Sequence, residues 1–235
     1  MRKILIAIDG PAGSGKSTTA KLVAQKLGYI YLDTGAMYRA ITLKVLISHI
    51  DLSHEDEIVQ LARNSDIMFL DNDGRSANSA RIILDGKDVS EKIRDEEITR
   101  NVSLVSSYPG VRRVMVDKQR VIGSQRSCVV EGRDIGTVVF PNADLKFYMI
   151  ADVMERARRR QAELSQGGTE LPIVQVVHEL KERDLKDSTR EASPLRKAGD
   201  AIEIDTTSLT IDEQVERILS FARDAKAMLE GVDKK

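Results

Sequence analysis

The feature that most constrains this chain is a glycine-rich octapeptide, Gly10–Ser17, which matches the pattern G-x-x-x-x-G-K-[ST]. The apolar run Ile4–Ile8 before it predicts a buried strand. The apolar residues of 20–27 after it recur at i, i+3, i+4 and i+7, which predicts a helix capped by Gly28. This strand–loop–helix context favours a phosphate-binding loop over a chance match in a Gly-rich turn.

Each residue type in the loop has a chemical reason. Glycines let backbone N–H groups turn toward phosphate oxygens, and the following helix adds the positive end of its dipole. Lys16 would supply a mobile cation for the β- and γ-phosphates, and the Ser17 hydroxyl would bind Mg²⁺ together with waters. The residues expected to bind a nucleoside triphosphate are Gly10, Pro11, Ala12, Gly13, Ser14, Gly15, Lys16, Ser17 and Thr18. Hydrolysis, phosphoryl transfer and switching remain open at this point.

Composition narrows the function classes. The 235 residues carry 36 Lys and Arg against 37 Asp and Glu, and aromatics are only 4%, so neither a basic surface nor base-stacking platforms for nucleic acid are expected. No apolar run approaches the ~20 residues that span a bilayer. The single cysteine, Cys128, fits a reducing compartment and is expected to be an inert buried thiol. We therefore expect a cytoplasmic protein, a monomer by default, with no membrane partner.

Short apolar runs alternate with helical patterns, which predicts an α/β fold with a mostly parallel sheet. The expected strands are 4–8, 29–32, 128–130, 145–150 and 201–204, and a Thr210–Glu213 capping box opens the last helix. Residues 66–70 and 80–84, around the turn 71–74, predict an antiparallel hairpin. A second region, 152–187, is expected to be irregular, a mobile flap with several arginines and the pair Gly167-Gly168.

Three further motifs carry a family resemblance: Leu32–Arg39 (LDTGAMYR), Glu131–Val139 (EGRDIGTVV) and Lys181–Asp184 (KERD). With the phosphate loop and an insertion of roughly forty residues, the chain resembles the bacterial cytidylate kinases, nucleoside monophosphate kinases of the P-loop class. The resemblance implies a single domain with a five-stranded parallel core (1–63, 104–151 and 188–235), a nucleotide-binding insertion (64–103) and an Arg-rich lid (152–187). It also implies ATP as donor, Mg²⁺ as cofactor, CMP and dCMP as acceptors, and a place in pyrimidine nucleotide metabolism.

The resemblance also assigns residues. Arg39, Arg133 and Arg190 would hold the acceptor phosphate, Arg183 and Asp187 the ribose, and Ser103, Arg112 and Asp134 the cytosine, with Thr34 also in the acceptor site. Lys16 and the lid residues Arg156, Arg159 and Arg160 would act on the transferring phosphoryl group. Arg158 receives no role. Glu131 stands where many relatives carry Asp, so its role stays open.

Elementary chemistry agrees with these assignments. A monophosphate acceptor is already an anion at pH 7, so catalysis needs positioning and charge cancellation rather than a strong general base. Arginine binds phosphate bidentately and stays charged. The three histidines are scattered and are expected to lie at the surface. Two alternatives remain: a kinase for another small acceptor, such as UMP or a cofactor precursor, and a nucleotide-binding regulator. The preference between CMP and dCMP, and between ATP and GTP, also stays open.

Overall fold

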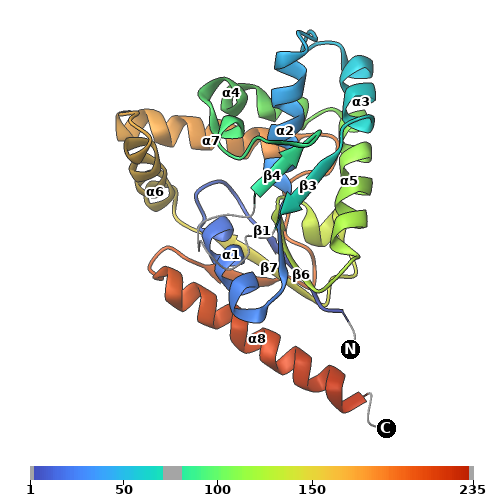
Figure 1. Ribbon diagram of the computed structural model, residues 1–235. Helices are drawn as coiled ribbons and strands as arrows, with labels where there is room; N and C mark the ends of the chain where they lie inside the picture. The colour runs from blue at the N-terminus through green and yellow to red at the C-terminus, as the bar shows by residue number, and fades with distance from the viewer. Residues whose placement is uncertain (1–2, 71–80, 233–235) are drawn as a thin grey trace. The chain divides into compact units, whose positions relative to one another are not determined.

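The computed structural model describes residues 3–70 and 81–232, and the chain forms two compact units (Figure 1). Unit 1 contains the chain up to Tyr31 and again from Arg126 onward, and unit 2 contains Leu32–Gln125. The insertion expected at 64–103 falls within unit 2. The finer division into core, insertion and lid stays a prediction.

A five-stranded parallel sheet forms the centre of unit 1, with the strand order β2-β6-β1-β7-β8. Its strands are β1 (Leu5–Asp9), β2 (Ile30–Asp33), β6 (Cys128–Gly132), β7 (Leu145–Ile150) and β8 (Ile202–Asp205), and the boundary between the two units falls within β2. The central strand β1 pairs in parallel with β6 and β7, and β7 pairs in parallel with β8. A central strand is covered on both faces, which explains why β1 is a continuous apolar run. The predicted α/β class and the five strands are confirmed.

The helices of unit 1 are α1 (Lys16–Leu27), α6 (Val153–Gln166), α7 (Ile173–Thr189) and α8 (Ile211–Val232), with a π-helical turn at Ile135–Val139. Helix α1 ends as predicted at Gly28, whose φ of +67° is the left-handed cap that glycine adopts easily. The predicted capping box opens α8, because Thr210 and Glu213 each bond the other's backbone N–H. No helix in the described part of the chain is both long and apolar enough to cross a bilayer.

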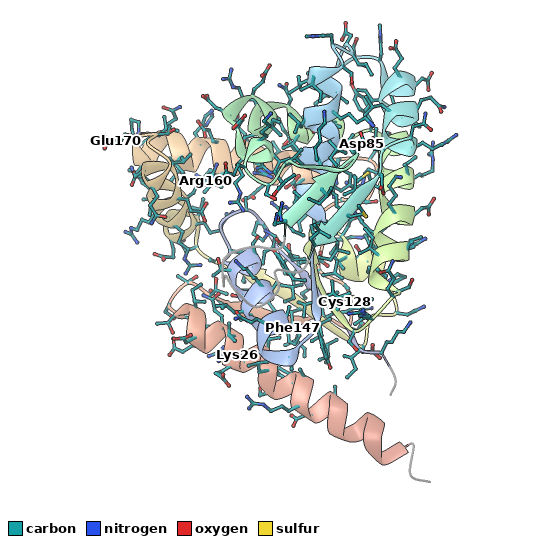
Figure 2. All side chains as sticks on the ribbon, viewed as in Figure 1. Lys26, Asp85, Cys128, Phe147, Arg160 and Glu170 are labelled. Carbon is teal, nitrogen blue, oxygen red and sulfur yellow. The ribbon has the colours of Figure 1, made fainter. Side chains whose placement is uncertain are left out.

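The main core of unit 1 lies between this sheet and the helices α1 and α8, which pack on each other (Figure 1). It contains fully buried side chains of β1 and β7 together with residues of both helices: Ile6, Ile8, Phe147, Met149, Val23, Val215 and Ile218. Cys128 is also fully buried, and burial raises the pKa of its thiol to about 12, as expected for an inert cysteine. Figure 2 labels both Phe147 and Cys128.

The expectation of an irregular segment over 152–187 is wrong, because most of it forms the two helices α6 and α7. The side chain of Asp152 accepts a hydrogen bond from Met154 N and caps α6. A small apolar cluster of Ala157, Val176 and Leu180 holds the two helices together. Apolar residues recur at a 3–4 spacing on α7, and α6 is stabilised by packing against that face.

Unit 2 combines helices with a small three-stranded antiparallel sheet. Its elements are α2 (Thr34–Ile47), α3 (Glu55–Arg63), β3 (Ile67–Leu70), β4 (Arg81–Leu84), β5 (Lys87–Asp88), a 3-10 turn at Lys92–Arg94, α4 (Glu96–Val105) and α5 (Pro109–Gly123). Strands β3 and β4 pair antiparallel, with Ile67 opposite Leu84. This confirms the predicted hairpin, whose turn at 71–74 lies outside the described residues.

Candidate active site

Four strands of unit 1 end at the same edge of the parallel sheet, and the segments that follow β1, β6, β7 and β8 start there. The loop after β1 carries the phosphate-binding pattern and leads directly into α1 at Lys16. A Cβ atom at Gly10 would overlap the carbonyl oxygen of Met149, so no larger residue fits. Gly13 has a φ of +75° and packs against Arg156. The overlap at Gly10 explains why the pattern requires glycine at that position, whereas Gly13 stands at a position that the pattern leaves open.

Lys16 is folded back over its own loop. Its Nζ donates to the carbonyl oxygen of Pro11 at 3.3 Å and lies 3.9 Å from Oε2 of Glu131. Glu131 in turn accepts a hydrogen bond from the hydroxyl of Tyr31 at 3.1 Å. Both members of the Lys16–Glu131 pair are buried. The structure therefore places Glu131, whose role the sequence left open, beside the cation of the phosphate loop.

Asp9, the last residue of β1, was not singled out from the sequence. Its two carboxylate oxygens accept hydrogen bonds from the backbone N–H groups of Ile135 and Gly136, both at 2.8 Å. Burial raises the pKa of Asp9 to about 7, although these two N–H groups act in the opposite direction. The carboxylate ties the start of the phosphate loop to the segment after β6, which carries Arg133 and Asp134.

Five of the residues expected to bind the acceptor belong to unit 1: Arg133, Asp134, Arg183, Asp187 and Arg190. The guanidinium of Arg133 donates to Asp187 at 2.8 Å. Arg190 lies 3.7 Å from Asp134 and 3.9 Å from Asp187. Burial alone would raise the pKa of Asp187, but the guanidinium groups of Arg133, Arg183 and Arg190 lower it below its usual value. The result is a mostly buried group of arginines neutralised by carboxylates, a composition suited to exchanging a carboxylate for a phosphate.

Unit 2 contains the other expected acceptor residues. Arg39 on α2 donates to the carbonyl oxygen of Ile93 at 3.2 Å and to the hydroxyl of Thr99 at 2.8 Å. Arg112 is buried on α5, donates to the carbonyl oxygen of Ser106 at 3.0 Å, and stacks over the ring of Tyr38. Thr34 is buried in the first turn of α2, and Ser103 is half-buried on α4. The aromatic contact of Arg112 could not be anticipated from spacing.

The arginines of α6 differ strongly in exposure. Arg156 is buried and donates to Asp184 at 2.7 Å and to the carbonyl oxygen of Ala12 at 3.1 Å. Arg159 is bound by Glu155 of its own helix and by Thr206, whereas Arg160 is bound by Glu163. Arg158 is 67% exposed, in line with its having no assigned role.

Thr206, directly after β8, is a second residue that sequence reasoning missed. It is fully buried, and its hydroxyl lies 2.9 Å from the carbonyl oxygen of Ser14 and 3.2 Å from Arg159 Nη1. Its carbonyl oxygen accepts a further bond from Arg159 at 2.7 Å. Its position directly after a predicted core strand could have marked Thr206 as a candidate site residue. Nothing in the sequence indicates that this threonine contacts the phosphate loop.

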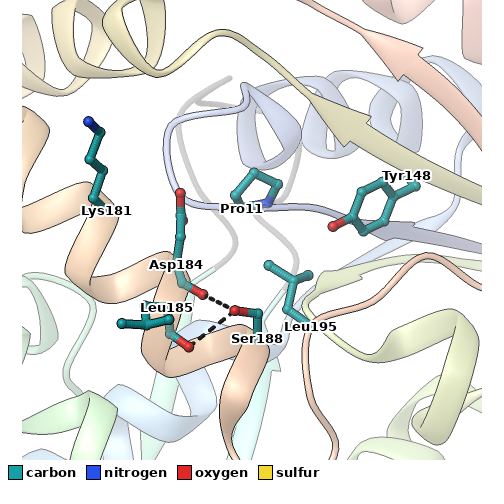
Figure 3. Close-up of a pocket in the computed structure, with 7 residues that line it drawn as sticks. All are labelled: Pro11, Tyr148, Lys181, Asp184, Leu185, Ser188 and Leu195. Atoms are coloured by element: carbon teal, nitrogen blue, oxygen red, sulfur yellow. Dashed lines mark hydrogen bonds between the residues drawn. The ribbon is translucent and has the colours of Figure 1, made fainter.

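A groove of about 440 Å³ opens beside the phosphate loop in unit 1 (Figure 3). Its lining residues come from the loop, β7, α7 and the segment after α7: Pro11, Tyr148, Lys181, Asp184, Leu185, Ser188 and Leu195. Figure 3 shows the carboxylate of Asp184 extending from α7 toward the loop. The groove therefore belongs to the same site.

The residues present also fit a nucleotide-bound magnesium ion. The Ser17 hydroxyl is exposed in the first turn of α1, and the Glu131 carboxylate lies at the end of β6. Among residues 3–70 and 81–232, no group of three or more His, Cys, Asp or Glu could hold a metal by itself. Mg²⁺ usually keeps several waters and uses one or two protein ligands beside substrate phosphates. The donor set suits an ion that arrives with a nucleotide.

The parallel sheet and its phosphate-binding loop define a P-loop nucleotide-binding protein of the α/β class. The comparisons with known proteins narrow this class. The family model for cytidylate kinase matches residues 6–224, and the chain therefore belongs to the cytidylate kinase family. A cytidylate kinase of Caldanaerobacter subterraneus subsp. tengcongensis is 52% identical over 94% of this chain and 95% of its own length. A cytidylate kinase of Clostridioides difficile is 49% identical over 94% of this chain and 98% of its own length.

Proposed function

We propose that this protein transfers the γ-phosphoryl group of ATP to CMP, and to dCMP, giving ADP and the cytidine diphosphate. Family membership gives the reaction class. The structural observation that carries the proposal is the arginine–carboxylate group of Arg133, Asp134, Asp187 and Arg190 in the same unit as the phosphate loop. Such a group suits an anionic acceptor.

The acceptor needs no general base, because its phosphate is already ionised at neutral pH. An oxygen of the CMP phosphate attacks the γ-phosphorus in line, the bond to the bridging oxygen of ADP breaks, and ADP leaves with that electron pair. Lys16 neutralises charge on the donor phosphates from its place in the loop. Arg133 and Arg190 are proposed to hold the acceptor phosphate, and the same role is proposed for Arg39.

We also propose that α6 and α7, which we call the α6–α7 hairpin, act as a lid that closes over the phosphate groups. Arg159 and Arg160 are partly exposed and held by ion pairs to Glu155 and Glu163, which phosphate oxygens can replace. Ser17 and, through water, Glu131 would hold Mg²⁺. The bound ion would supply positive charge at the phosphate oxygens during transfer. The cytoplasmic location and the monomeric state stay predictions from the sequence.

Cytosine selectivity is proposed to depend on Asp134, Arg112 and Ser103, and ribose binding on Arg183 and Asp187. Asp134 is buried, and its carboxylate can accept from the exocyclic amine of cytosine. Uracil presents a carbonyl oxygen at that position, so two acceptors would face each other. Arg112 can donate to the ring nitrogen or carbonyl of the base.

The test is a coupled ADP-release assay with ATP, Mg²⁺ and each of CMP, dCMP, UMP, AMP and GMP. Strong turnover with CMP and weak turnover with UMP is the expected result, and Asp134→Ala should remove the difference. Turnover with another monophosphate instead would keep the kinase and reject the cytosine site. No ADP release above background with any of the five monophosphates would contradict the proposal.

A further inference from the structure

Asp184 and Arg156 form the tightest link between α7 and the phosphate loop. Arg156 Nη1 donates to Asp184 Oδ2 at 2.7 Å and to the Ala12 carbonyl oxygen at 3.1 Å, while Nε donates to the Ala151 carbonyl oxygen at 3.1 Å. One guanidinium thus joins the loop, the segment after β7 and a carboxylate on α7. The Arg156 side chain is only 8% exposed, whereas the Asp184 side chain is 26% exposed and borders the groove.

The contact with the loop is also steric. A Cβ atom at Gly13 would lie 3.0 Å from both the Cβ atom and the carbonyl oxygen of Arg156. A shift of Arg156 therefore changes the space available to the loop backbone. Within the described residues, Arg156 is the one side chain that hydrogen-bonds the Asp184 carboxylate, whose other oxygen is buried without a hydrogen bond. In the part of the chain that the structure describes, no second hydrogen bond would hold the carboxylate if Arg156 moved.

The same helix carries the acceptor residues. Asp187 follows Asp184 by three residues, so the two carboxylates lie one turn apart on neighbouring faces of α7. Asp187 accepts a hydrogen bond from Arg133 at 2.8 Å. The positive charges of Arg183 and Arg190 also act on its carboxylate and lower its pKa. Helix α7 is thus bonded to the acceptor arginines through Asp187 and to the phosphate loop through Asp184.

We propose that Asp184 is a positioning residue that couples acceptor binding on α7 to the phosphate loop through Arg156. The proposal rests on the function proposed above. When an acceptor phosphate engages Arg133 and Arg190, the balance of charges around Asp187 changes and α7 shifts with it. Asp184 passes that shift to Arg156, and Arg156 passes it to the Ala12 carbonyl. Linkage requires that donor and acceptor change each other's affinity by the same factor, and we expect that change to be an increase.

The test measures this coupling directly. Calorimetry gives the Kd for CMP with and without a saturating non-hydrolysable ATP analogue, and the ratio of the two values is the coupling factor. For the wild type we expect a factor of at least about five, the lower end of typical allosteric coupling. In Asp184→Asn, which keeps the shape and removes the charge, the factor should fall below about twofold. The Kd for each ligand alone should change less, because in this proposal Asp184 acts through Arg156 rather than as a ligand contact.

Two further variants keep the result interpretable. Glu179→Gln is the matched control, because it removes the charge of an exposed carboxylate on the same helix, which accepts a hydrogen bond from Gln175; its coupling factor should equal that of the wild type. Should Asp184→Asn fail to fold, Arg156→Lys keeps the positive charge and loses the forked donor, and it should lose coupling as well.

The outcomes separate the two proposals. A wild type that phosphorylates CMP but shows no coupling, or an Asp184→Asn protein that keeps it, overturns the role of Asp184 alone. A wild type that neither binds nor phosphorylates CMP overturns the proposed function, and this inference with it.

Discussion

The phosphate loop and the α6–α7 hairpin both belong to unit 1, and they are held in different ways. The loop connects β1 to α1, two elements that contribute fully buried side chains to the main core, such as Ile6, Ile8 and Val23. The hairpin is held by a small cluster around Ala157, Val176 and Leu180. Because less apolar surface is buried, we expect the hairpin to open at a lower free energy than the loop.

Their charges differ as well. The cation of the loop, Lys16, is buried and bonded to its own loop at Pro11. The cations of the hairpin are arginines paired with carboxylates, from the buried Arg156 to the exposed Arg158. A rigid loop with a prepositioned cation suits a nucleotide that must be held in one geometry. Arginines in exchangeable ion pairs suit an element that changes partners when substrate arrives.

The largest effect should come from the loop. Lys16→Ala should lower kcat by roughly 10²–10³, the scale of losing one preorganised electrostatic contact. Lys26→Ala is the matched control, because Lys26 lies on the same helix in an exposed pair with Glu216 and should be near wild type. The measurement is steady-state kinetics with ATP and CMP. Equal losses in both variants would contradict a special role for Lys16.

Asp9 makes the stability of the loop region depend on pH. Its pKa rises from 3.8 to about 7 in the folded protein, so the folded state binds the extra proton between these values and stability falls as pH rises through that window. Asp9→Asn lacks this titration. At ~1.4 kcal/mol per pKa unit, wild-type stability relative to Asp9→Asn should fall by about 2–4 kcal/mol from pH ~4 to ~7.

Urea denaturation of both proteins across that range is the measurement. A stability difference that does not change with pH would show that the N–H groups of Ile135 and Gly136 keep Asp9 ionised throughout. The hairpin offers the contrast, since Asp187 has a lowered pKa and stays ionised over the same range.

On the hairpin, Asp187→Asn should raise the KM for CMP about tenfold, or about 1.4 kcal/mol. The substitution removes the charge that balances Arg133 and Arg190 and the contact proposed for the ribose. Glu182→Gln, an exposed carboxylate on the same helix, should leave KM unchanged. The KM for ATP serves as internal reference, and an equal rise there would argue for general distortion instead.

The smallest effect should be at Arg158. Its guanidinium is exposed and pairs with Glu155 of the same helix at 3.5 Å, and such surface pairs contribute about 0–1 kcal/mol. Arg158→Ala should therefore change kcat/KM less than about twofold. The same assay on Arg160→Ala is the comparison, and a larger loss there would support the lid role of Arg160. A large loss at Arg158 would overturn the distinction between the two.

Prediction from the sequence succeeded where local pattern decides. Four predicted features depend mainly on residues close together in the sequence: the apolar run of β1, the cap at Gly28, the capping box at Thr210 and the strands β3 and β4. The irregular segment predicted over 152–187 failed because the mean polarity of α6 hides its helical face. That face is defined by packing against Val176 and Leu180, which are distant in sequence.

The sequence by itself determined the fold class, the phosphate loop and the family, because each depends on residue types at short, regular spacings. Only the tertiary structure decided which groups neutralise each other. Asp9 with Ile135 and Gly136, and Asp184 with Arg156, join segments that are 28 to 127 residues apart. The physical reason is that hydrogen bonding and charge pairing act over a few ångströms in space. No spacing along the chain records which residues the sheet brings that close.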